Sequence, residues 1–198
     1  SGANTYTGAT TISGGTLRLG AAGVVADGSA ISLGGGTLSS GASAGFSETM
    51  GTLALTANST IALGTGNHSL TFANSSAVSW TAATTLTITG WTGTAGASGT
   101  GGKIFVSNTT GTLTSGQLAQ ISFSGYSAGA MLLSTGEVVP LLALPTIATT
   151  DAASSITNTS ASTGGQTIAG SGLTAKGVVY STAAVSTTPT LANSVLTD

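Results

Sequence analysis

Three acidic side chains, Asp27, Glu48 and Glu137, are the carboxylates of the first 140 positions that could work as general acids or bases. A glycoside hydrolase or a polysaccharide lyase needs two such groups in one groove, within about 10 Å of each other. The whole chain holds only five acidic and three basic residues, too few to surround such a pair with helpers. We therefore expect no catalytic residues and no enzyme. A carbohydrate-active enzyme built on these carboxylates is the alternative.

His68 is the single histidine and could act as a base, a metal ligand or a pH switch. Each role needs a partner, and the nearest acidic residue, Glu48, lies 20 positions away. Cysteine is absent, and no Asp-x-Asp-x-Asp array offers a calcium site. The glycine-rich stretches 34–36 and 99–102 lack the Gly-Lys-Ser/Thr of a phosphate loop. We expect His68 and these glycines to form turns, with no metal and no cofactor bound.

The two tryptophans could contact sugars, because an indole face can stack on a pyranose ring while its N–H finds a polar partner. Trp80 is evenly spaced with Phe72 and Ile88, which favours a place in the core. Trp91 stands among small residues in Gly90-Trp91-Thr92-Gly93, and core packing and glycan contact are both open for it. Trp91 is therefore the candidate glycan contact.

The segment Thr85 to Thr89 reads Thr-Leu-Thr-Ile-Thr and suggests a second kind of surface. Alternate threonines on a flat strand surface can match an ice lattice if the array repeats on neighbouring strands. Thr60-Ile61-Ala62 repeats it only in part. Ice binding is therefore a further alternative.

Asparagines recur near the ends of the predicted strands. Asn58, Asn67 and Asn74 are spaced for left-handed corner positions or for an inward-facing amide ladder. Five Asn-x-Ser/Thr sequences could accept glycans after export. They begin at Asn58, Asn67, Asn74, Asn108 and Asn158.

The chain is almost free of charge. Charged residues make up 4% of its 198 residues, with a formal net charge of −2, whereas about 25% is usual. Three cations cannot neutralise a run of phosphates or bind an anionic membrane surface, which excludes nucleic-acid binding. The longest apolar run, 138–144, contains Pro140 and is far shorter than the ~18 residues of a membrane-spanning helix. We expect no membrane insertion, and a surface whose polarity comes from serine and threonine.

Short alternations of apolar and hydroxyl residues, separated by glycines, predict half-buried strands throughout. The second apolar residue of successive segments falls at positions 55, 63, 72, 80 and 88. Two or three strands per turn at this step give coils of about 17–25 residues. Stacked coils satisfy backbone groups without charged surfaces, and small corner residues let coils approach closely, so we predict a parallel β-helix. The predicted strands up to position 88 are 11–13, 16–19, 30–33, 37–38, 52–55, 60–63, 69–72, 78–80 and 85–88.

The amino-acid composition changes near Lys103, where larger apolar residues become frequent. A strand at 103–106, a helical turn at 115–120 and strands near 121–123, 131–133 and 137–140 predict a terminal cap on the solenoid. We thus expect a β-helix at 1–140 with its cap from about 103, and a linker at 141–145 between Pro140 and Pro145. Positions 146–198 predict an Ig-like β-sandwich, incomplete because such a domain needs ~100 residues.

The segment Asn4 to Leu17, NTYTGATTISGGTL, resembles the autotransporter-associated β-strand repeat, in which N-x-Y-x-G-x-T-x-I-x-x-G-x-L recurs. Positions 113–140 are similar to the segment that closes such passengers. Positions 160–182 resemble the fibronectin-type-III-like modules of Bacteroidota surface proteins. These resemblances imply a right-handed parallel β-helix followed by a sandwich module in a large secreted protein, and no catalytic residues. They also imply a type IX secretion substrate or a gliding-motility surface protein.

Taken together, residues and resemblance predict a structural or adhesive stalk segment of a bacterial cell-surface protein, an excerpt of a longer extracellular chain. Its expected partners are glycans or other surfaces, contacted weakly over broad areas, and further domains of the same chain. The alternatives are a carbohydrate-active β-helix enzyme and an ice-binding solenoid.

Overall fold

The computed structural model describes residues 2, 4–107, 112–127 and 129–142, and beyond them 146–150, 154–155, 157, 165–169, 177–180 and 194–197. Contacts divide the chain into two units, Ser1–Leu141 and Leu142–Asp198. The division falls within the predicted linker 141–145.

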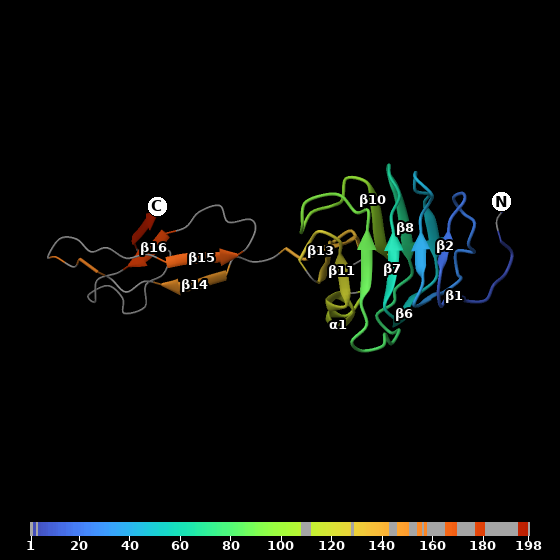
Figure 1. Ribbon diagram of the computed structural model, residues 1–198, viewed down its shortest axis with the longest axis horizontal. Helices are drawn as coiled ribbons and strands as arrows, with labels where there is room; N and C mark the ends of the chain where they lie inside the picture. The colour runs from blue at the N-terminus through green and yellow to red at the C-terminus, as the bar shows by residue number, and fades with distance from the viewer. Residues whose placement is uncertain are drawn as a thin grey trace. The chain divides into compact units, whose positions relative to one another are not determined.

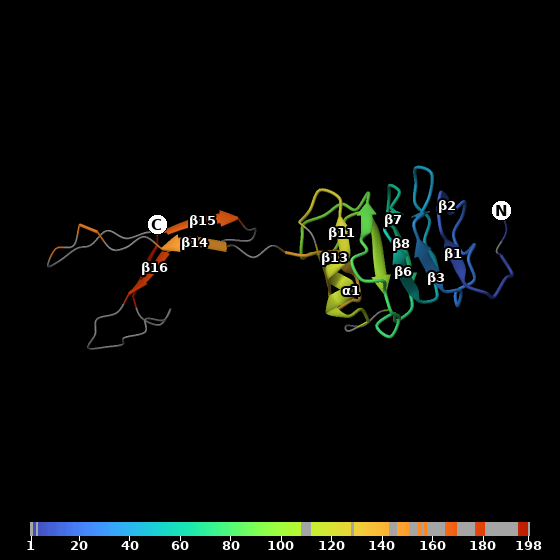
Figure 2. The same ribbon diagram turned by 60° about the horizontal axis from the view of Figure 1, so that its bottom comes forward.

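Parallel strands of the first unit form three sheets, which we call faces A, B and C. Face A contains β1 (Thr10–Ile12), β3 (Ile31–Gly34) and β6 (Leu53–Ala57). Face B contains β2 (Thr16–Arg18), β4 (Thr37–Ser39), β7 (Ser59–Ala62), β9 (Leu86–Thr89) and β11 (Ile121–Phe123). Face C contains β5 (Glu48–Met50), β8 (His68–Phe72) and β10 (Gly102–Val106). Figures 1 and 2 show the strands of face B side by side in coil order. The predicted parallel solenoid is confirmed.

The pairing register gives the length of each coil. Thr37 pairs with Thr16 and with Thr60, which are 21 residues before it and 23 residues after it. Thr87 pairs with Thr60, a step of 27, and Ser122 with Thr87, a step of 35. The first coils therefore have the predicted length, and the later ones carry insertions between their strands.

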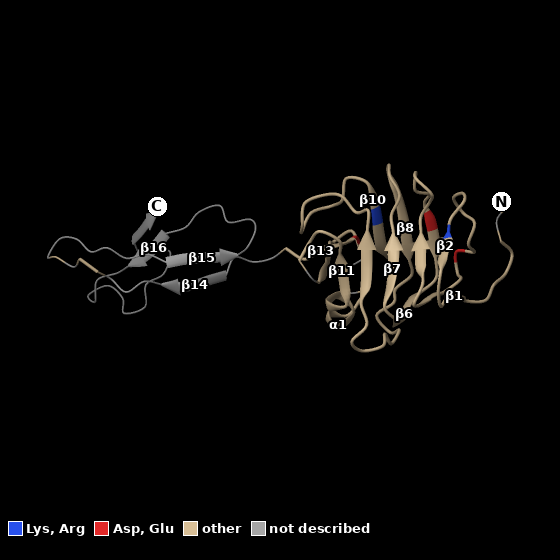
Figure 3. Ribbon diagram, viewed as in Figure 1, with Lys and Arg blue, Asp and Glu red and all other residues tan. Residues whose placement is uncertain are grey.

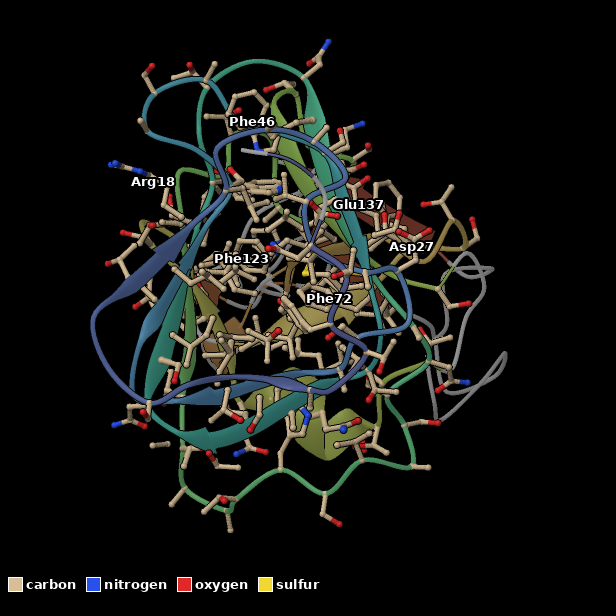
Figure 4. The ribbon with its side chains drawn as sticks, turned by 90° about the vertical axis from the view of Figure 1, so that its right-hand side faces the viewer. Arg18, Asp27, Phe46, Phe72, Phe123 and Glu137 are labelled. Atoms are coloured by element: carbon tan, nitrogen blue, oxygen red, sulfur yellow. The ribbon has the colours of Figure 1, made fainter. Side chains whose placement is uncertain are left out.

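Apolar residues stack in columns inside the coils, because alternate strand residues face inward. Phe72 lies in register between Met50 and Val106 on face C, and all three are 1% exposed. On face B the inward column is Leu17, Leu38, Ile61, Ile88 and Phe123. Figure 4, viewed along the stack, shows Phe72 and Phe123 inside the ring of ribbon and Arg18 outside it. The core is thus one continuous stack of side chains.

Two glycines lie where the chain of one coil touches the chain of the coil before it. A Cβ on Gly51 would stand 2.6 Å from the carbonyl oxygen of Gly28, and one on Gly64 would stand 2.7 Å from that of Ser43. No other residue fits so close to another backbone. The expected role of small residues in coil approach is borne out here.

Two serine hydroxyls link neighbouring coils by hydrogen bonds. The Oγ of Ser75 accepts the N–H of Leu53 at 2.9 Å and donates to the carbonyl of Ala73 at 2.8 Å. Ser59 does the same with the N–H of Gly35 and the carbonyl of Ala57, both at 2.9 Å. We call Ser59 and Ser75 the coil-bridging serines. Each serine thereby satisfies a backbone donor of the preceding coil and a backbone acceptor two residues before itself.

We expect Ser75→Ala to destabilise the solenoid by about 1–3 kcal/mol, because it leaves the N–H of Leu53 without an acceptor in a buried site. Ser75 is 0% exposed. The matched control is Ser76→Ala, whose hydroxyl bonds Asn74 at the surface, and there the change should stay within about 0.5 kcal/mol. Guanidinium unfolding measures both, and equal losses would contradict the bridging role.

The C-terminal end of the first unit is covered by a short helix and a hairpin. Helix α1 (Ser115–Ala119) has Thr114 as its N-cap residue, which forms a capping box with Gln117. The Gln117 amide reaches back to the carbonyls of Ser75 and Val78, both at 2.9 Å. Strands β12 (Ala130–Leu132) and β13 (Val138–Pro140) pair antiparallel. Both the helical turn and the strands of the predicted cap occur.

The predicted strand at 78–80 is wrong. The chain there runs as a loop along the free edge of β6 instead of joining face A. The indole N–H of Trp80 donates to the carbonyl of Leu53 at 3.0 Å, and the N–H of Thr81 donates to that of Leu55 at 2.8 Å. Two edge acceptors are satisfied this way without another strand.

The second unit contributes two antiparallel strand pairs. Strand β14 (Thr146–Thr150) pairs with β15 (Gly165–Ala169), and β16 (Gly177–Tyr180) pairs with β17 (Ser194–Thr197). Antiparallel pairing is what a sandwich requires. The sandwich itself stays a prediction.

Candidate functional site

The two buried carboxylates, Glu48 and Glu137, do not form the pair that a hydrolase would need. Asp27 is exposed, whereas Glu48 and Glu137 are 3% and 1% exposed. Glu48 stands on β5, and Glu137 bridges to Phe105 on β10, so β8 and β10 separate the two backbones. Three strand spacings are about 14 Å. An enzyme that uses Glu48 and Glu137 as its acid–base pair therefore finds no support in the structure.

Both buried carboxylates are used within the fold. Glu48 accepts the N–H of Val24 at 2.8 Å through Oε2. Glu137 accepts the hydroxyl of Ser98 at 2.6 Å and the N–H of Gly99 at 2.8 Å. Glu137 thereby fastens the loop before β10 to the cap. Nothing in the local sequence indicated this contact, because its partners lie 38 and 39 positions away.

His68 is the first residue of β8 and is 6% exposed, so the expectation of a turn residue was wrong. Its Nδ1 lies 3.0 Å from the carbonyl of Gly66, which can only accept, so Nδ1 carries the proton. Nε2 then accepts the hydroxyl of Ser40 at 2.8 Å. A serine and a histidine in this geometry could form a nucleophile and its base. Ser40 is 0% exposed, however, and its hydroxyl is closed to any substrate.

Trp91 is a core residue in this structure. It is 6% exposed and packs edge-on against Phe123 at 5.5 Å and Tyr126 at 5.1 Å between ring centroids. The Tyr126 hydroxyl donates to the carbonyl of Gly93 at 2.7 Å and holds this cluster closed. With its faces covered by protein, the ring offers no surface for a sugar. The structure gives the glycan hypothesis no support at this residue.

The asparagines follow neither proposed arrangement. Positive φ angles outside glycine occur at Ala83, Ser107 and Ser155 among the described residues, and at none of Asn58, Asn67 and Asn74. The side-chain Oδ1 of Asn58 accepts the N–H of Thr85, one coil later, at 2.8 Å on the surface. Asn58 and Asn74 therefore cap backbone groups at corners instead of forming an inward ladder. Asn108 and Asn158 lie outside the described residues.

One column of hydroxyls runs across the outer side of face B. It consists of Thr16, Thr37, Thr60, Thr87 and Ser122, each in register with the next. The neighbouring column is mixed: Arg18, Ser39, Ala62 and Thr89. Figure 3 shows β7 and β11 free of charge. The Thr-x-Thr pattern of β9 is thus not repeated on the other strands of face B. A Thr-x-Thr array would need two columns of hydroxyls, and face B has one.

A groove of about 340 Å³ opens between the loop along β6 and helix α1. Trp80 is half-buried and lines it, with Gly116 and Gln120 on the opposite wall. The complete lining is Ser76, Ala77, Val78, Ser79, Trp80, Thr114, Gly116, Gln117 and Gln120. All nine residues are uncharged. The sequence placed Trp80 in the core and left Trp91 open, whereas the structure exposes part of Trp80 and buries Trp91.

The described part of the chain contains no group of three or more metal-ligating side chains. Within the same residues, no helix is long and apolar enough to cross a membrane.

A family model described as passenger-associated-transport-repeat matches residues 1–19. This stretch contains β1 and β2 and overlaps the Asn4–Leu17 motif. No curated protein and no solved structure matches the chain. The match and the parallel solenoid together fit an autotransporter-associated structural repeat.

Proposed function

We propose that residues 1–141 are a structural stalk segment of a secreted bacterial cell-surface protein, in which stacked coils hold other parts of the chain at a distance. The repeat that matches residues 1–19 belongs to transported passengers, which supports export. Neutral serine and threonine surfaces suit an extended extracellular fibre.

The observation that carries this proposal is the difference between the two ends of the coil stack. Among the described strands, β1 pairs with β3 alone and β2 with β4 alone, so each presents an unpaired edge. At the other end, Gly136 accepts the N–H of Val106 at 3.0 Å and Gly129 donates to Ile121 at 3.1 Å. An open parallel edge in coil register is a surface on which a further coil can stack. A covered end stops the stack.

Finer parts of the function rest on resemblance. An adhesive role would add weak contacts with glycans or other surfaces. The antiparallel pairs β14–β15 and β16–β17 support a fibronectin-type-III-like module at 146–198. Export by type IX secretion and a part in gliding rest on the Bacteroidota-like motif alone.

Surface labelling tests the proposal. Antibodies against residues 4–107 should label intact cells of the bacterium that makes the chain, and protease added outside should remove the label. A cytoplasmic protein detected only after permeabilisation is the control. Label that requires permeabilisation would overturn the assignment to the cell surface.

A further inference from the structure

The groove beside Trp80 has the composition of a site for a neutral ligand. Its nine lining residues carry hydroxyls, amides and one indole but no charge. A charged ligand would lose water there without gaining an opposite charge. An apolar ring flanked by a few polar groups is the usual composition of a small-molecule site.

Trp80 is held in place before any ligand arrives. Its indole N–H donates to the carbonyl of Leu53 at 3.0 Å, which fixes one edge of the ring against β6. Across the groove, Gly116 carries no side chain, and a Cβ there would meet only the Thr114 hydroxyl, at 3.9 Å. The half-buried Trp80 ring and this glycine line the same groove. A fixed ring loses little conformational entropy on binding.

Polar groups with unused capacity stand beside this ring. Gln120 donates through Nε2 to the carbonyls of Thr81 and Thr84, at 2.7 and 3.1 Å, which orients its amide and leaves Oε1 as a free acceptor. Ser79 is exposed, and its hydroxyl makes no hydrogen bond with any described residue. A fixed aromatic face, an amide acceptor and a hydroxyl are complementary to one face and the hydroxyls of a pyranose.

We propose that the Trp80 groove binds a neutral oligosaccharide, with one pyranose ring on the indole and sugar hydroxyls bonded to Gln120 and Ser79. This goes beyond a stalk function and does not depend on it. One stacked ring in a shallow groove gives a Kd on the order of 1 mM. Many copies on one surface would be needed for firm attachment.

The test is titration of the complete chain with cellohexaose, mannohexaose, laminarihexaose and chitohexaose, followed by NMR of the two indole N–H groups. At least one sugar should shift the Trp80 signal at about 1 mM and leave Trp91 unchanged. The Gly116→Leu variant fills the groove without touching the Trp80 hydrogen bond and should weaken binding at least about tenfold. Gly28→Leu is the matched control, because a Cβ at Gly28 meets nothing within 4 Å.

Thermal unfolding of both variants first establishes that they are folded. Binding that Gly116→Leu reduces and Gly28→Leu preserves supports the proposal. It is overturned if none of the four sugars shifts the Trp80 signal at about 10 mM, tenfold above the expected Kd. It is also overturned if Gly116→Leu binds as well as the unaltered chain.

Discussion

Replacing Phe72 by alanine should lower the free energy of unfolding of the first unit by about 3–5 kcal/mol. Phe72 is 1% exposed and lies in register between Met50 and Val106, so its loss opens a cavity in the middle of the stack. Neighbouring coils cannot close the gap, because their backbones are joined by parallel pairing on both sides. Guanidinium unfolding followed by circular dichroism measures the change.

Phe46→Ala is the matched control, since Phe46 is half-buried and packs at the margin of the core. Its loss should cost clearly less than that of Phe72. Phe72→Leu keeps most of the volume and should cost about 1.5 kcal/mol or less, which leaves a measurable protein if the alanine variant fails to fold. Equal losses at Phe46 and Phe72 would contradict a continuous core.

Insertion of one additional coil should give a folded and more stable protein. A second copy of residues 31–52 placed after Thr52 adds 22 residues, the step that joins Ile31 to Leu53 on face A. The copied coil should carry Glu48→Leu. In the unaltered chain the residue in register with Glu48 on the next coil is Leu70, so a leucine suits this position of an inner coil. At about 0.1 kcal/mol per residue, one coil should add about 2 kcal/mol.

The control insertion is a copy of residues 31–41, which is half as long. It moves every later strand to the wrong face and should abolish cooperative unfolding. Calorimetry distinguishes the two insertions. Similar melting of both proteins would show that the coil step does not determine the fold.

Much of the solenoid could be predicted because the information is local. Alternation in Leu53-Ala54-Leu55 or Ile61-Ala62-Leu63 determines which residues face inward, and the step of eight or nine residues between segments predicts the length of the first coils. The helix at 115–119 is encoded by a capping box within four residues, Thr114 to Gln117. Each of these features needs only neighbours along the chain.

The contacts that decide the candidate site are remote in sequence. Ser40 lies 28 positions from His68, and the groove joins Trp80 to Gly116 on another coil. The regular spacing with Phe72 and Ile88 predicted a core position for Trp80, and that prediction assumes three strands in every coil. The coil between β7 and β9 has a loop on face A instead, and this loop turns the indole toward the strand edge. Trp91 lacks alternating neighbours, yet its burial depends on Phe123 and Tyr126, more than 30 positions away.

The coil-bridging serines have a consequence for the conditions under which the fold persists. Dissolved ions weaken attraction between exposed charges over distances of about 8–10 Å, but they have little effect on a short bond between a neutral hydroxyl and an amide. Ser59 and Ser75 make only bonds of this neutral kind. The hydrogen bonds that Ser59 and Ser75 make between coils should therefore hold equally well in fresh water and in brine.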